Sequence, residues 1–322
     1  MSRVLPLGLC LAAAVGCASP PTFDVGLAAT PDAPADEVLR FIVTGDTGKG
    51  NAVERRVARS MSVACAARGG CRFALLVGDN VYENGPQGVD DPELRTKFEE
   101  PFAPDPFPFW VALGNHDYGG GGAGWDFWKA RDEIAWSHRD PKWRMPARHY
   151  AFTDAHADFF ALDTTALFWM DDDAQTSAFE ARLQVSARPW RIAFGHHPYL
   201  SNGRHGDAGH YDRVPSWMPG SGERWRRFFA EHVCHHVDAY FAGHDHTMQD
   251  LGEHCGVQLF VSGAGSSPTK LRRHHRGLFE ASGPGFAMVE LTATRMRVSF
   301  YDAAAHELWN RTIEHTGGLT PR

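Results

Sequence analysis

The sequence is short of positive charge. Its 322 residues contain 32 Lys and Arg against 39 Asp and Glu, so the formal net charge is 32 − 39 = −7 with histidine neutral. Proteins that hold nucleic acid through its phosphates need a surplus of basic residues. We therefore expect no nucleic-acid partner.

The sequence also lacks an apolar run long enough to span a bilayer as a helix, which takes about 20 residues. Residues 5–15 are apolar but too few, and they follow Arg3, as in a secretory signal. The stretch AAAVGC ends at Cys17 like a bacterial lipoprotein cleavage site, at which the cysteine would carry a lipid anchor to the membrane. Ordinary cleavage near Ala18 is the alternative.

These features divide the chain into three parts. We expect residues 1–17 to be the signal, residues 18–37, which are rich in Pro, Ala and Asp, to be a tether, and residues 38–316 to be one folded domain. The prediction is an exported protein, either a periplasmic or outer-membrane lipoprotein or a secreted one.

Cysteines are few, and their spacing is not that of a zinc ribbon. Of the six, Cys10 would leave with the signal and Cys17 is the candidate for lipid. An even number then remains, which in an exported protein predicts disulfides. The pairs that are close in sequence are Cys65–Cys71 and Cys234–Cys255.

What the sequence does contain is a recurring pattern, a short apolar run followed by glycine and a polar residue. It occurs in LRFIVTGDTG, FALLVGDN, FWVALGNHD, WRIAFGHHP and AYFAGHDH. Such runs predict strands that are buried on both faces of a sheet covered by helices. Further strands are expected at residues 158–162, 257–261, 286–291 and 297–301.

Helical segments separate these runs. Residues 51–67 carry apolar side chains at one-turn spacing behind Asn51, a candidate N-cap, and residues 223–235 form a second candidate helix. The alternation predicts an α/β domain with a parallel or mixed sheet. Residues 118–157, rich in glycine and tryptophan, are expected to form an elaborate loop region near a site.

Polar side chains gather where the predicted strands end, the position at which open α/β sheets bind ligands. Taken singly, each of these motifs also fits a turn. Residues two apart in an extended chain share a face, so His244 and His246 should point into one space and Asp245 away from it. The candidates are Asp46, Asp79, Asn115, His196, His244 and His246.

The order of these motifs, GD, GDxxY, GNH, GH and GHxH, resembles that of the metallophosphoesterases. Tyr82 in GDNVY makes the chain similar to the purple acid phosphatases, in particular the small tartrate-resistant type, over residues 39–308. The resemblance implies a four-layer α/β/β/α sandwich with two mixed β-sheets and a site at the carboxyl ends of strands. It further implies hydrolysis of phosphomonoesters, with a metal-activated hydroxide as the nucleophile.

The resemblance also implies two metal ions bridged by Asp79. The first ion would be held by Asp46, Asp79, Tyr82 and His246, and the second by Asp79, Asn115, His196 and His244. An anionic set with a phenolate favours Fe(III) at the first position, and the second set suits Fe(II), Zn(II) or Mn(II). His197 is the neighbour of His196, and the family pattern favours the residue directly after glycine as the ligand.

Two histidines near the metals bind the substrate and protonate the leaving group in this family. The matching residues are His116 of GNH and His205 in SNGRHGDAGH, with His210 as a competitor for the second role. Asp163, at another strand end, is expected to brace the site.

Two other functions fit the same motifs. A phosphodiesterase or nucleotidase would use the same metal centre, with its substrate chosen by loops such as residues 119–147. Trp125, Trp128, Trp136 and Trp143 of these loops would stack on a substrate or pack in the fold. A non-catalytic, lipid-anchored protein that binds metal or phosphate would have no need of His116 and His205. The sequence carries no signal for an oligomeric state.

Overall fold

The structure is a computed structural model and describes residue 34 and residues 36–315. The expected signal with Cys17 and most of the expected tether lie outside these residues and stay predictions. In the part that is described, no helix is both long and apolar enough to cross a membrane.

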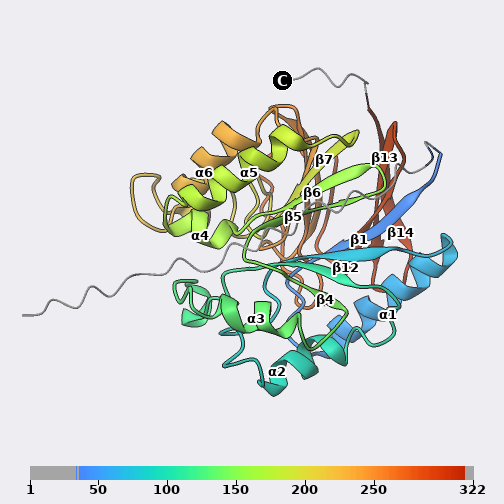
Figure 1. Ribbon diagram of the computed structural model, residues 1–322, viewed down its shortest axis with the longest axis horizontal. Coiled ribbons are helices and arrows are strands. Elements are labelled where there is room, and N and C mark those ends of the chain that lie inside the picture. Colours follow the sequence, from blue (N-terminus) through green and yellow to red (C-terminus); the bar gives the residue numbers. More distant parts are fainter. Residues whose placement is uncertain (1–33, 35, 316–322) are drawn as a thin grey trace, which may run out of the picture.

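Two seven-stranded mixed sheets form the middle of the domain (Figure 1). In spatial order, the first sheet consists of β14 (Glu307–Glu314), β13 (Arg295–Asp302), β12 (Gly285–Leu291), β1 (Leu39–Thr44), β2 (Phe73–Val77), β3 (Phe109–Ala112) and β4 (Trp143–Arg144). The second consists of β11 (Phe279–Ala281), β9 (Met248–His254), β10 (Val257–Ser262), β8 (Ala239–Ala242), β7 (Trp190–Phe194), β6 (Ala157–Ala161) and β5 (Tyr150–Asp154).

Helices flank the pair of sheets on both outer sides. Figure 1 shows the first three helices beside the sheet that contains β1, and the last three beside the sheet that contains β7. They are α1 (Ala52–Ala67), α2 (Pro92–Leu94), α3 (Ala130–Trp136), α4 (Thr164–Trp169), α5 (Asp173–Val185) and α6 (Glu223–Phe228). The expected α/β/β/α arrangement with two mixed sheets is therefore present.

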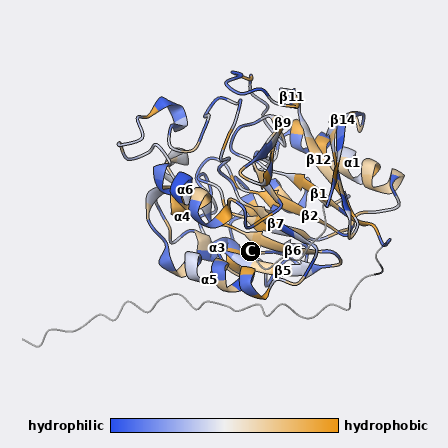
Figure 2. Ribbon diagram, turned by 90° about the horizontal axis from the view of Figure 1, so that it is seen from above, coloured by the Kyte–Doolittle hydropathy of each residue, from blue (hydrophilic) through white to orange (hydrophobic). Residues whose placement is uncertain are grey.

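The main core lies between the two sheets, where aromatic rings from both meet. Phe41 on β1 contacts Phe159 on β6 and Phe241 on β8, with ring centroids 5.3 and 6.5 Å apart. Ser262 at the end of β10 donates to the carbonyl of Val43 on β1 at 2.7 Å. Figure 2 shows apolar strands inside and polar residues on the helices outside. Burying apolar area on both faces is what the all-apolar strand runs predicted.

Most of the predicted elements are present with small shifts at their ends. Asn51 caps α1, and its side chain accepts the N–H of Glu54 at 2.9 Å. The helix expected at residues 223–235 is α6 followed by a π-helical turn, Phe229–Val233. The region 118–157 is more ordered than a loop, because it contains α3, β4 and β5. Trp136 and Trp143 in it are buried, whereas Trp125 and Trp128 are exposed.

Both expected disulfides are present. Cys65 and Cys71 have Cα atoms 5.3 Å apart, and those of Cys234 and Cys255 are 5.2 Å apart. The second bridge, Cys234–Cys255, does not lie beside the loop that presents His244 and His246. It lies instead at the far end of β9, because that strand runs from Met248 to His254 away from the motif.

Candidate metal centre

The polar motifs follow strands of both sheets, not the one sheet that the alternation of elements suggested. Parallel strands β1, β2 and β3 lead to Asp46, Asp79 and Asn115. Parallel strands β7 and β8 of the other sheet lead to His196 and His244. Because the sheets pack face to face with these strand ends on the same side, the two halves of the motif pattern meet in one place.

The backbone turns sharply at the motifs. Asp46, Asp79 and His244 all have left-handed backbones, with φ of 56°, 55° and 65°. Such conformations cost a non-glycine residue about 1–3 kcal/mol and cluster at functional sites. Gly243, which directly precedes His244, must also be glycine, because a Cβ there would lie 2.6 Å from Asp46 Oδ2. Glycine at this position is thus needed for the close approach of the two loops.

One group of donor atoms gathers around the Tyr82 phenol. Its oxygen lies 3.1 Å from Asp46 Oδ1 and 3.0 Å from His246 Nε2, and those two atoms are 3.3 Å apart. Ligand atoms of Asp46, Asp79 and His246 all lie within 4.8 Å of one another, as for a metal ion. Neighbouring ligands of an ion with bonds of about 2.1 Å are expected about 3 Å apart.

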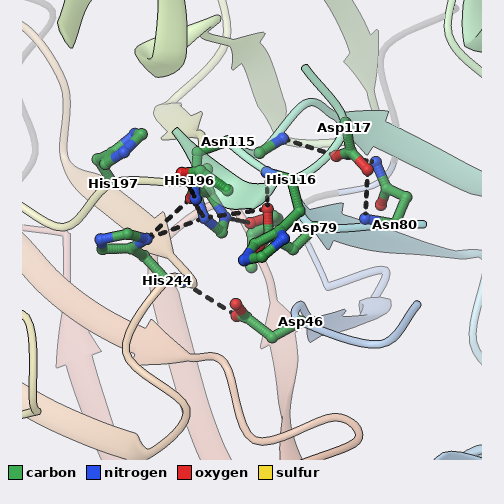
Figure 3. Close-up of polar contacts among 12 residues, drawn as sticks. Asp46, Asp79, Asn80, Asn115, His116, Asp117, His196, His197 and His244 are labelled. Atoms are coloured by element: carbon green, nitrogen blue, oxygen red, sulfur yellow. Dashed lines mark hydrogen bonds and ion pairs between the residues drawn. The ribbon is translucent and has the colours of Figure 1, made fainter. Parts of the chain in front are cut away.

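A second group lies on the other side of Asp79 (Figure 3). His196 Nε2 is 2.8 Å from Asn115 Oδ1, 3.1 Å from His244 Nδ1 and 3.4 Å from Asp79 Oδ1. His244 Nδ1 is itself 3.1 Å from Asn115 Oδ1. All four side chains are buried. Asp79 therefore lies between the two groups, which is where a bridging carboxylate would be needed.

Two ligand atoms of the second group, His196 Nε2 and Asn115 Oδ1, present lone pairs to each other. His196 Nδ1 lies 2.9 Å from the carbonyl of Val77, which can only accept, so Nδ1 carries the proton and Nε2 is left as an acceptor. Asn115 Nδ2 donates to Gly122, which turns its oxygen toward Nε2. Two facing acceptors 2.8 Å apart repel unless a cation lies between them. The residues therefore fit the metal centre that the resemblance to the purple acid phosphatases implies.

The electrostatics of the first group, around the Tyr82 phenol, also favour a bound cation. Burial raises the pKa of Tyr82 well above its usual value, and the carboxylates of Asp46 and Asp79 raise it further. A phenolate at this position therefore requires a compensating cation. Burial lowers the pKa of His246, but the carboxylates of Asp46 and Asp79 and the carbonyl of Ser267 together outweigh it and bring that pKa to about 9. The group thus attracts positive charge strongly.

The two candidate proton donors lie on either side of these groups. His116 has its ring 4.5 Å from that of Tyr82, and its backbone N–H donates to Asp79 at 2.9 Å. His205 has its ring 4.4 Å from that of His244, and its Nδ1 lies 3.0 Å from Asp212 Oδ1. His205 therefore faces the second group, with a carboxylate behind it that fixes the ring.

The other histidines considered from the sequence lie outside the donor groups. His197 is buried against Thr164 and Phe168, and Figure 3 shows it beside, not within, the cluster of Asn115 and His196. Burial lowers its pKa well below the usual value, as expected of a packed neutral ring. His210 is exposed.

Asp163 braces the surroundings of the site, as its strand-end position suggested. Its Oδ2 accepts Tyr118 and Arg148, each at 2.6 Å. Its Oδ1 accepts the N–H of Ala166 and so caps α4. The three contacts tie the glycine-rich region to the second sheet.

Sequence reasoning missed a buried carboxylate that joins two motifs. Asp117 accepts the N–H groups of Asn80, Val81 and Gly114 at 2.8–3.0 Å (Figure 3). Burial and the neighbouring Asp79 raise its pKa to about 7. Glu133 of α3 reaches the same place and accepts Asn80 Nδ2 at 3.2 Å. The stretch GNHDY carried the only sequence signal for this network, namely an aspartate directly after GNH.

Known proteins share both the sequence pattern and the fold. The family model of calcineurin-like phosphoesterases matches residues 39–248, more than half of the chain. Human tartrate-resistant acid phosphatase type 5 is 26% identical, with 87% of this chain and 92% of that protein aligned. Purple acid phosphatase 7 of Arabidopsis thaliana is also 26% identical, with 87% of each chain aligned.

Solved structures agree on the fold. GAP50, described as the anchor in the inner membrane complex of Plasmodium, superposes with a TM-score of 0.67 at 20% identity, over 88% of this chain and 90% of its own. PhoD superposes with a TM-score of 0.58 at 13% identity, over 88% and 69%. The purple acid phosphatase relatives imply a binuclear metal centre. The chain therefore belongs to the calcineurin-like phosphoesterase family, as a phosphoric ester hydrolase similar to the acid phosphatases.

Proposed function

We propose that this protein is an exported phosphatase that hydrolyses phosphomonoesters at a binuclear metal centre. The observation that carries the proposal is the position of Asp79 between two groups of donor atoms, one around Tyr82 and one around His196. When bound, two metal ions neutralise charge on the phosphoryl oxygens and activate water at moderate pH.

The ligand sets follow from the two groups. Asp46, Tyr82 and His246 would hold one ion, and Asn115, His196 and His244 the other, with Asp79 shared. Three anionic oxygens in the first set favour Fe(III). The second set, with an amide and two imidazoles, suits Fe(II), Zn(II) or Mn(II).

The remaining residues act on the substrate. An alkoxide leaving group needs a proton, which a positioned histidine can donate. His205 is suited to this role because Asp212 holds its Nδ1 at 3.0 Å and leaves Nε2 free for the substrate. Asp212 also raises the pKa of His205, against the lowering effect of burial. His116, beside the Tyr82 ring, would bind the phosphoryl group from the opposite side.

A comparison of two chromogenic substrates tests the proposal. Purified protein with measured metal content should hydrolyse p-nitrophenyl phosphate faster than bis(p-nitrophenyl) phosphate, and Asp79→Ala should lose both activity and metal. A faster diester reaction would make the protein a phosphodiesterase. Full metal content without turnover of either ester would make it a binding protein and overturn the proposal.

Export is a separate part of the proposal. It is supported by the two disulfides, which persist in oxidising compartments. Lipid on Cys17 rests on the sequence alone, and the relatives reported above are eukaryotic proteins. Labelling with a radioactive fatty acid should mark the wild type and not Cys17→Ser. Equal labelling of the two would exclude lipidation at this residue, and recovery of both proteins from the cytosol would exclude export.

A further inference from the structure

A groove lined by basic residues lies beside the metal centre. Its volume is about 520 Å³, and it is lined by Arg204, Pro268, Thr269, Lys270, Arg272 and Ser282. Most of its cations come from residues 268–276, PTKLRRHHR, which we call the basic loop. The basic loop contains four Lys and Arg and no Asp or Glu, although the chain as a whole is acidic.

The groove is joined to the metal centre through the backbone. Thr269 of the basic loop donates its N–H to the carbonyl of His246 at 2.9 Å. Arg204, which also lines the groove, directly precedes His205 in sequence. A small molecule that placed one group at the metals would therefore extend other groups into this groove.

The basic loop is held in place by buried Asn202, two residues before Arg204. Asn202 accepts the backbone N–H of Arg272 through its carbonyl at 2.7 Å, and that of His274 through its side chain at 2.6 Å. Its Nδ2 donates to the carbonyl of His275 at 2.9 Å. The loop that carries His205 and the basic loop are thus fixed to each other, so the backbone that carries the cations is in place before any ligand arrives.

The cations of the groove and of the basic loop differ in the ion pairs that they form with other described residues. Among residues 36–315, Arg204, Lys270 and Arg272 form no ion pair, whereas Arg273 pairs with Glu280 at 3.0 Å and His275 with Asp207 at 2.8 Å. Arg204, Lys270 and Arg272 are exposed. His205 chiefly lowers the pKa of Asp212, and Arg204 and Arg272 lower it further, so this carboxylate lies within electrostatic reach of both guanidinium groups.

We propose that this groove is a second anion subsite, which binds one phosphoryl group of a small bisphosphorylated substrate while the other lies at the metals. Guanidinium groups match phosphoryl oxygens in a bidentate way, and lysine adds a point charge. The inference rests on the proposed phosphatase function and deepens it, because it names the class of substrate.

Alkyl phosphates that all release a primary alcohol, with and without a second phosphoryl group, test the subsite. The rate constant kcat/KM is measured for butyl phosphate and for the bisphosphates of 1,2-ethanediol, 1,4-butanediol and 1,6-hexanediol. Two equivalent ends give a bisphosphate about a twofold statistical advantage. We call kcat/KM for a bisphosphate divided by kcat/KM for butyl phosphate the ratio. A bound second phosphoryl group should raise this ratio at least about tenfold above the statistical value for one chain length, which is the effect of one charge-assisted hydrogen bond.

Variants then locate the effect. Lys270→Gln combined with Arg272→Gln should return the ratio of bisphosphate to butyl phosphate to about the statistical value of two. Arg273→Gln, in the same loop but paired with Glu280, is the matched control and should leave the ratio unchanged. Raising the salt to about 0.5 M should also reduce the ratio in the wild type, since exposed charges are screened.

The possible failures are distinguishable. A wild-type ratio near two for every chain length, with butyl phosphate hydrolysed normally, would overturn the subsite and leave the phosphatase function intact. A high ratio that the double variant retains would overturn its assignment to this groove. Absence of turnover of butyl phosphate by fully metal-loaded protein would instead contradict the proposed function.

Discussion

The carboxylate of Asp245 accepts the backbone N–H of His205 at 2.8 Å. Asp245 lies between the two histidines of GHDH, and its side chain points away from the donor groups, as predicted. The backbone is bent here and not extended as the prediction assumed, because His244 is left-handed. It also accepts the Ser201 hydroxyl at 2.5 Å and the N–H of Gly206 at 3.3 Å. One side chain therefore connects the motif with His244 and His246 to the loop that carries the candidate proton donor.

Asp245→Asn should disturb this loop without removing a metal ligand. The amide nitrogen would face donors in place of the carboxylate oxygen that accepted them, so the position of His205 should loosen. We expect kcat for alkyl phosphates to fall on the order of tenfold, as when a positioned general acid is impaired. Metal content by elemental analysis should stay at the wild-type value, and its loss would show that Asp245 supports the ligands instead.

His205→Ala should slow esters of different leaving groups unequally. Alkyl phosphates need protonation of the leaving oxygen and should slow by about 100-fold or more, whereas p-nitrophenyl phosphate should slow only a few-fold. The matched control is His306→Ala, which removes an exposed histidine that also pairs with an aspartate, Asp302, at 3.2 Å. Equal losses on both esters would assign His205 to substrate binding.

Tyr82→Phe keeps the ring and removes the phenol oxygen from the first donor group. With Fe(III) bound, the wild type should show a visible charge-transfer band from the phenolate, and the variant should lose both the band and the tight retention of the ferric ion. Tyr150→Phe is the control, because its phenol is also buried but donates to the carbonyl of Val111 at 2.9 Å. Iron-loaded wild type without a visible band would remove Tyr82 from the ligand set.

The Cys234–Cys255 bridge should contribute to the free energy of unfolding and not to metal binding. Its sequence separation of 21 predicts a loss of about 3 kcal/mol in the free energy of unfolding when both cysteines become serine. The bridge Cys65–Cys71, with a separation of 6, predicts about 2 kcal/mol. Denaturant unfolding measures both. Metal content should not change in Cys234→Ser/Cys255→Ser, because β9 separates the bridge from His246.

Asp105 should make stability depend on pH in the neutral range. Burial raises its pKa from 3.8 to about 7, and its Oδ2 has no partner among the described residues. The folded chain therefore holds this proton more tightly than the unfolded chain does. The stability that results is fully present below about pH 4 and is lost as the pH rises through about 7. Asp105→Asn should unfold at higher denaturant concentration than the wild type at pH 8 and not at pH 4. The same difference in denaturant midpoint at pH 4 and at pH 8 would show that ionisation of Asp105 is not the cause.

The strands were predictable where they are buried on both faces. β2 is apolar at every position and is buried throughout, so its run of five residues suffices to predict it. The edge strands were missed. β14 alternates between half-buried and exposed residues, and β11 is half-buried in all its residues, because each has a neighbour on one side only. An edge strand carries a weaker apolar signal than a central one.

The sequence by itself determined the order and the local form of the motifs. Gly–Asp and Gly–His pairs at strand ends, and an Asp and a Tyr three residues apart, are short-range features that a reader can recognise without the fold. Their conformation is local too, because the left-handed backbone at Asp46 and Asp79 belongs to the sharp turn after each strand. Residue types and spacing therefore named the polar candidates at the strand ends, and the resemblance to the purple acid phosphatases added Tyr82 and the division into two ligand sets.

Only the tertiary structure decided how these pieces face one another. Tyr82 and His246 are 164 positions apart, and their contact exists because two sheets pack face to face. The same packing placed Asp117 between two motif loops and Asp212 behind His205. It also set the basic loop beside the metal centre through Asn202. Such contacts depend on the burial of many apolar side chains at once, so no single stretch of sequence encodes them.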